Sequence, residues 1–76
     1  MGEDRRAGFE EFVRGQSASL LRLAYLLTGD VHAGEDLLQG VLEKMYLRWH
    51  RIRRDPVAYA RRALVNPPSR TVAQWG

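Results

Sequence analysis

Apolar side chains recur every three or four residues along most of this chain, and that spacing restricts it to a helical fold. Three stretches show it, each with one apolar face. Residues 9–27 contribute Phe9, Phe12, Val13, Leu20, Leu23, Ala24 and Leu27. Residues 31–49 contribute Leu38, Val41, Leu42, Met45 and Trp49, and Ile52 extends this face. Residues from 56 onward contribute Val57, Ala60, Ala63 and Leu64. No stretch alternates in the manner of a strand, so the sequence predicts an all-α fold.

Helix-terminating residues separate the three stretches. Thr28-Gly29 ends the first, because glycine adopts the left-handed conformation that commonly follows a helix. Asp30 is a favourable N-cap for the second, and Asp55 followed by Pro56 begins the third. Asn66-Pro67-Pro68 ends it, since proline cannot continue a helix.

Short connections between successive helices indicate antiparallel neighbours, so we expect a small three-helix bundle. The pattern allows a short fourth helix at the C-terminus, capped by Ser69 and reaching Trp75. We expect a flexible arm over residues 1–8, a helical domain over residues 9–66, and a proline-interrupted, truncated segment over residues 67–76.

Gly34 and Gly40 each weaken the second helix by about 1 kcal/mol relative to alanine. Such a glycine either admits a close neighbour or is merely tolerated.

Charge divides the chain into two unlike parts. Residues 1–47 hold five basic and eight acidic side chains, whereas residues 48–76 hold seven arginines and one acid, Asp55. A basic half is suited to the phosphate backbone of nucleic acid, where neutralisation of charge drives binding. The same run of charges is also typical of an ordinary solvated face.

Several classes of function find no support in the sequence. There is no cysteine for a disulfide or a thiolate metal site, and His32 and His50 lie too far apart for a short helical metal pair. No phosphate-binding loop or nucleophile motif occurs, so we expect neither an enzyme nor a cofactor. No apolar run resembles a signal peptide or a membrane span, which predicts a cytoplasmic protein.

Three runs together carry a resemblance to a known family. FEEFVRGQSASLLRLAYLLTGD, HAGEDLLQGVLEKMYLRW and RIRRDPVAYARRALVN follow one another in order, and EDLLQ before YLRW is the most specific part. From residue 9 to residue 66 the chain resembles region 2 of bacterial extracytoplasmic-function (ECF) sigma factors, closest to an actinobacterial group.

The resemblance implies two binding surfaces. The second helix would bind the clamp helices of the RNA polymerase β′ subunit through Glu35, Asp36, Gln39 and Glu43. The third helix and its flanks would bind the non-template strand of the minus-ten promoter element. The residues implied are Arg51, Arg53, Arg54, Tyr59, Arg61, Arg62, Asn66 and Arg70. Tyr59 and Trp75 are candidates for stacking on bases, and so is Trp49 if it is exposed, although its place on the apolar face favours the core.

The chain also departs from the family. Gly40 stands where members usually carry an acid, and Pro67-Pro68 interrupts a helix that is normally continuous and basic. The helix-turn-helix half of such factors does not follow, so we expect a fragment or a protein without full sigma activity. These departures leave an alternative: an interaction module that binds polymerase or an anti-sigma factor without opening a promoter. A membrane-surface peptide fits less well, because the basic residues do not share a helix with a strong apolar face.

Overall fold

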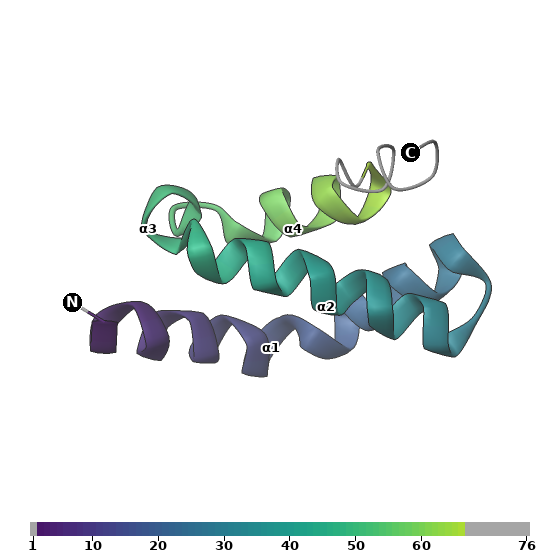
Figure 1. Cartoon of the computed structure of the whole chain (residues 1–76), viewed down its shortest axis with the longest axis horizontal. Helices are drawn as coiled ribbons and strands as arrows, with labels where there is room; N and C mark the ends of the chain where they lie inside the picture. The colour runs from purple at the N-terminus through teal and green to yellow at the C-terminus, as the bar shows by residue number, and fades with distance from the viewer. Residues whose placement is uncertain (1, 67–76) are drawn as a thin grey trace.

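The computed structural model describes the backbone of residues 2–66 and the side chains of residues 5–66, and this part of the chain is all-helical. Its helices are α1 (Gly2–Thr28), α2 (Val31–Leu47), α3 (Trp49–Ile52) and α4 (Pro56–Val65). Figure 1 shows α1 and α2 antiparallel and side by side, and α4 packs against both of them. The predicted all-α bundle is confirmed. A fourth helix is present at α3, and the predicted C-terminal one lies outside the described residues.

Three predicted helix boundaries are correct: the end of α1 and the starts of α2 and α4. Gly29 has a φ of +76°, and its N–H donates to the Tyr25 carbonyl at 2.7 Å. The Asp30 carboxylate accepts from the Ala33 N–H at 2.9 Å and caps α2. The Asp55 carboxylate accepts from the Ala58 N–H at 3.4 Å, and Pro56 begins α4. Local capping chemistry therefore fixes both connections.

Two predicted boundaries are wrong. The first helix begins at Gly2 and not at Phe9, so residues 2–8 are helical where we expected a flexible arm. The reason is tertiary packing, because Gly8 lies against Trp49 and the Arg5 guanidinium lies 5.7 Å from the centre of the Tyr46 ring. The second helix ends at Leu47, since the Arg48 N–H approaches the carbonyls of both Lys44 and Met45 and tightens the last turn.

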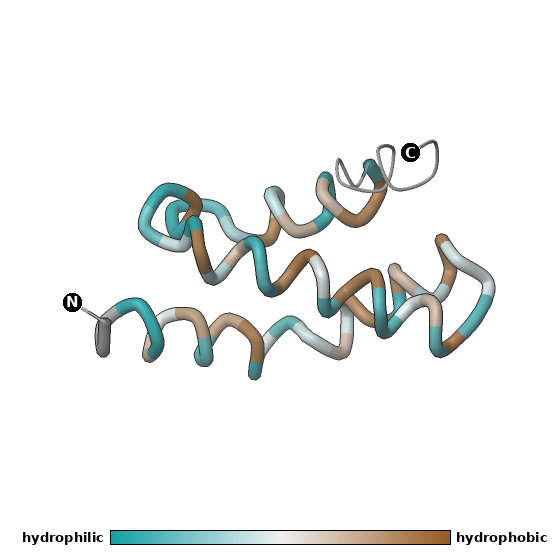
Figure 2. The backbone as a smooth tube through the Cα atoms, in the orientation of Figure 1, coloured by the Kyte–Doolittle hydropathy of each residue, from teal (hydrophilic) through white to brown (hydrophobic). Residues whose placement is uncertain are grey.

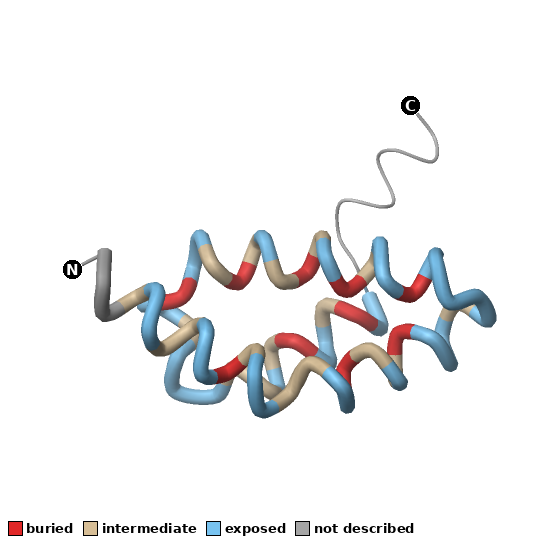
Figure 3. The backbone as a smooth tube through the Cα atoms, turned by 90° about the horizontal axis from the view of Figure 1, so that it is seen from below, coloured by how far each residue is buried: buried red, intermediate tan, exposed pale blue. Residues whose placement is uncertain are grey.

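The core lies where α1, α2 and α4 face one another. Figure 3 shows the buried positions on the inward sides of these helices. The buried apolar residues are Phe12, Leu20, Ala24, Leu38, Val41, Met45, Trp49, Ala60 and Leu64. All of them belong to the predicted faces, whereas Leu27, which we also placed there, is 45% exposed at the end of α1.

At Gly34 the backbone of α2 lies close to the backbone of α1. A Cβ there would lie 3.1 Å from both the backbone nitrogen and the Cα of Tyr25. No such neighbour exists at Gly40, where a Cβ would meet nothing within 4 Å. Of the two alternatives for these glycines, close approach therefore applies to Gly34 and mere tolerance to Gly40.

No helix within residues 2–66 combines the length and the hydropathy needed to cross a bilayer.

Candidate protein- and nucleic-acid-binding surfaces

The four polar residues singled out on the second helix all lie on the surface of α2. Glu35, Asp36, Gln39 and Glu43 are exposed, and we call them the acidic face. Asp36, Gln39 and Glu43 are three and four residues apart and so lie along one side of the helix, with Glu35 beside them. Leu38, Val41 and Met45 are buried on the opposite side. The packing of α2 therefore presents these groups to solvent from a helix whose opposite side is buried.

Two residues that precede the acidic face in α2 and its cap, Asp30 and Gly34, position it. The Asp30 cap sets where α2 begins, and the contact at Gly34 sets its distance from α1. The first turn of α2 contains no acid, so Glu35 and Asp36 belong to the second turn. The helix dipole stabilises charges mainly within the first turn, and the benefit that the sequence suggested for these two acids is therefore small.

The polar groups of the acidic face have no partner among the described side chains. The single ion pair found in residues 5–66 joins Arg14 to Glu11 at 3.5 Å, and both lie on α1. No side-chain hydrogen bond within the same range involves Glu35, Asp36, Gln39 or Glu43. The three carboxylates and the amide are thus available to a basic partner. Binding them need not break a contact among the described side chains.

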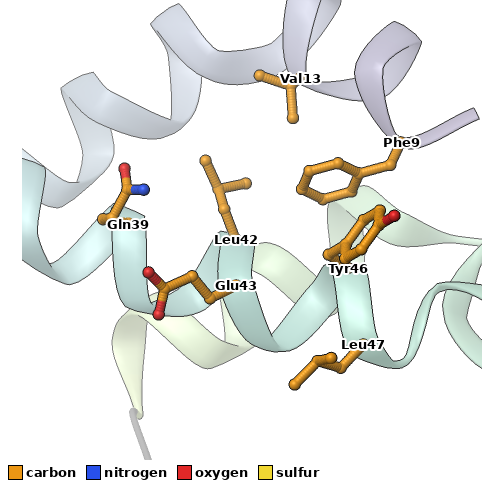
Figure 4. A pocket seen from close by; sticks show the side chains of 7 residues that line it. All are labelled: Phe9, Val13, Gln39, Leu42, Glu43, Tyr46 and Leu47. Carbon is orange, nitrogen blue, oxygen red and sulfur yellow. The ribbon is translucent and has the colours of Figure 1, made fainter. Parts of the chain in front are cut away.

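An apolar groove adjoins the acidic face, and sequence reasoning missed it. It has a volume of about 570 Å³ and is lined by Phe9, Val13, Gln39, Leu42, Glu43, Tyr46 and Leu47. Figure 4 shows Phe9 and Val13 entering from α1 and the other five side chains from α2. Periodicity places each residue on its own helix, but a groove between two helices depends on how they pack.

Four aromatic rings gather beside this groove. The Phe9 ring lies 5.2 Å from that of Tyr46 and 5.6 Å from that of Trp49, both edge to face, and Phe12 lies 5.7 Å from Trp49. Trp49 is 7% exposed, which confirms its prediction as core and removes it as a stacking surface for bases. Tyr46 is only half-buried.

The arginines proposed for nucleic acid are exposed. Arg51 belongs to α3, Arg53 and Arg54 to the turn after it, and Arg61 and Arg62 to α4; we call these five the basic segment. Figure 2 shows the strongly hydrophilic stretch at α3 and the following turn. Asp55 is the only acid in residues 48–66, and it caps α4. Asn66 is exposed at the end of α4, while Arg70 and Trp75 lie outside the described residues.

Tyr59 is held in place by a residue that the sequence did not single out. Its ring is half-buried against the core, and its hydroxyl accepts a hydrogen bond from the Arg48 guanidinium at 3.2 Å. The two residues are eleven positions apart, on either side of α3, and no local pattern signals such a contact. The contact links the end of α2 to α4.

Comparison with known proteins yields two relatives from Streptomyces. The chain is 43% identical over 69 residues to an RNA polymerase sigma-E factor of Streptomyces coelicolor, across 88% of this chain and 37% of that protein. It is equally similar to a sigma-E factor of Streptomyces avermitilis, with 36% of that protein covered. The chain thus spans just over a third of the length of these relatives. No family model matches it, and no solved structure does.

Proposed function

We propose that the chain is a non-catalytic transcription-initiation module of the actinobacterial ECF sigma factor family. The proposal rests on its similarity, over the segment it spans, to sigma-E factors of Streptomyces. In this proposal the acidic face binds the clamp helices of the RNA polymerase β′ subunit. The basic segment, with Tyr59 and Asn66, binds the non-template strand of the minus-ten promoter element. The observation that carries the proposal is the exposure of the whole acidic face opposite a buried stripe.

Clamp binding is supported by the chemistry of the acidic face. A basic helix laid along α2 would find carboxylates and an amide at intervals of about one turn. Since none of these groups is engaged within residues 5–66, binding need not displace an internal contact. The chain is cytoplasmic in this proposal, because that is where it would meet polymerase.

DNA binding is supported by the charge and order of the basic segment. Five exposed arginines occur between Arg51 and Arg62, and no described carboxylate pairs with them. Arginine suits phosphate because its planar fork donates two hydrogen bonds at once. Tyr59 has its hydroxyl engaged by Arg48 and one side against the core, so its role would be limited to contact by the remaining ring surface.

The clamp proposal is tested by binding to an isolated fragment of the β′ clamp helices. We expect Asp36→Ala and Gln39→Ala each to weaken binding about tenfold or more. The first removes a carboxylate and the second an amide that would bind polar or basic groups of the clamp helices. Ser19→Ala is the control, since Ser19 is an exposed polar residue on α1 that does not line the α1–α2 groove or its adjoining hollow. Unchanged affinity for Asp36→Ala and Gln39→Ala contradicts the proposal.

The DNA proposal is tested with a single-stranded minus-ten oligonucleotide over a range of salt. If about four or five arginines meet phosphates, the slope of log affinity against log salt is about −3. Arg61→Ala should reduce that slope, whereas Arg22→Ala, on the exposed side of α1, should leave it unchanged. Clamp binding with no DNA binding at any salt concentration would instead favour an interaction module that does not open a promoter.

A further inference from the structure

We propose that the groove between α1 and α2 receives one aliphatic side chain of the same clamp helix that the acidic face binds. This inference rests on the proposed function and adds an apolar anchor to it. It predicts that the partner is an amphipathic helix in which an aliphatic residue is flanked by basic ones. The residues that would hold this anchor are Phe9, Val13, Leu42, Tyr46 and Leu47.

The groove and the acidic face are continuous. Gln39 and Glu43 belong to both, because they line the groove and also continue the row begun by Glu35 and Asp36. A helix laid on Gln39 and Glu43 therefore covers the groove as well. Figure 4 shows the carboxylate of Glu43 and the amide of Gln39 beside the apolar lining side chains.

The charges around the groove select a basic occupant. Glu43 stands on the α2 side, and Glu10 lines an adjoining hollow that shares Phe9 and Val13 with the groove. Both acids are exposed, and neither forms an ion pair within residues 5–66. The nearby Arg14 is already paired with Glu11. The Arg5 guanidinium also lies near the groove, 5.7 Å from the centre of the Tyr46 ring, but the two carboxylates outnumber it. This excess of acid beside an apolar floor favours an aliphatic residue that has lysine or arginine as neighbours in its helix.

Leu47 gives a separate reason to expect that the groove is covered. It is 69% exposed at the groove, although it belongs to a helix whose other apolar residues are mostly packed. Exposed leucines are common singly, but this one adjoins a concave apolar surface, as partner-binding anchors do. Burial of Leu47 by an inserted aliphatic side chain would join it to the ring surfaces of Phe9 and Tyr46.

The test uses the whole chain and the isolated β′ clamp-helix fragment. We expect Leu47→Ser to weaken binding about fivefold to tenfold, because it removes apolar contact at the anchor. Leu26→Ser is the matched control: Leu26 is 72% exposed but lies near the other end of the α1–α2 pair. Val13→Thr keeps the shape of the side chain, adds a hydroxyl on the α1 side of the groove, and should also weaken binding.

Salt separates the anchor from the acidic face. The loss caused by Leu47→Ser should persist at high salt, whereas the loss caused by Glu43→Gln should shrink, since only the second interaction is screened. Each aliphatic residue of the clamp fragment is then replaced by alanine. One of these replacements should weaken binding to the unaltered chain but cause no further loss of affinity for Leu47→Ser. Circular dichroism checks that every variant remains folded.

The outcomes distinguish the two proposals. Binding that is lost in Asp36→Ala but equal in Leu47→Ser and Leu26→Ser overturns the anchor and leaves the proposed function standing. An absence of any binding by the unaltered chain overturns the proposed function, and the anchor with it. A Leu47→Ser defect that vanishes at high salt also contradicts the anchor.

Discussion

The indole of Trp49 lies directly against the backbone of Gly8. A Cβ at Gly8 would be 2.9 Å from the Trp49 Nε1, closer than such atoms come in folded proteins. The ring has little room to retreat, because the rings of Phe9 and Phe12 lie 5.6 and 5.7 Å from it. This contact joins the first part of α1 to the start of α3, and it explains why the first helix extends beyond its predicted boundary.

We expect Gly8→Ala to lower the free energy of unfolding by about 1 kcal/mol, as measured by urea denaturation. The methyl group clashes with a confined ring, which costs about 1–3 kcal/mol, and improved helix propensity offsets only part of this cost. Gly15→Ala is the control, since a Cβ at that position of the same helix meets nothing within 4 Å. It should raise stability by up to about 1 kcal/mol. Equal stabilisation by both variants would show that the Gly8 contact is unimportant.

Gly34→Ala should be more damaging, with a loss of about 2 kcal/mol. The atoms in its way are the backbone nitrogen and Cα of Tyr25 at 3.1 Å, so relief requires α1 and α2 to separate. Gly40→Ala lies in the same helix but in open space, and it should stabilise the protein by up to about 1 kcal/mol. Thermal denaturation of the two variants side by side measures the difference. A stabilised Gly34→Ala variant would contradict this helix packing.

Asp30→Ala should cost about 1 kcal/mol of stability, because the Ala33 N–H loses its acceptor at the start of α2. Asp36→Ala removes the same charge from the same helix, but its exposed side chain caps nothing within residues 5–66. We expect a change within about 0.5 kcal/mol for that variant. Chemical denaturation at fixed salt compares them, and equal losses would mean that charge matters rather than capping.

Gly40→Glu tests, on the proposed clamp-binding surface, the departure of this chain from the family that it resembles. Position 40 has space for a side chain, and an acid there would extend the acidic face beside Gln39. We expect affinity for the β′ clamp-helix fragment to rise about threefold to tenfold at low salt and less at high salt. Gly40→Ala separates this effect from simple stabilisation of the helix. An affinity gain of the same size in Gly40→Ala would remove the role assigned to charge.

Sequence reasoning succeeded where the signal is local. The end of the first helix at Gly29, the caps at Asp30 and Asp55, and the end of α4 before Pro67 follow from residues within one turn. It failed at the start of α1, where helix formation accompanies contact with residues about forty positions away. For the candidate surfaces, the exposure of the acidic face and basic segment agrees with the pattern, while their binding roles stay predictions.

By itself the sequence determined which stretches form helices and which side of each is apolar, because periodicity and capping act within one helix. Only the tertiary structure decided how closely those helices meet. It brought Phe9 and Val13 of α1 beside Leu42 and Tyr46 of α2 to make the groove, and it joined Arg48 to Tyr59 across α3. The physical reason is that such contacts depend on the distance between helix axes, which close approaches such as that at Gly34 set and no single helix encodes.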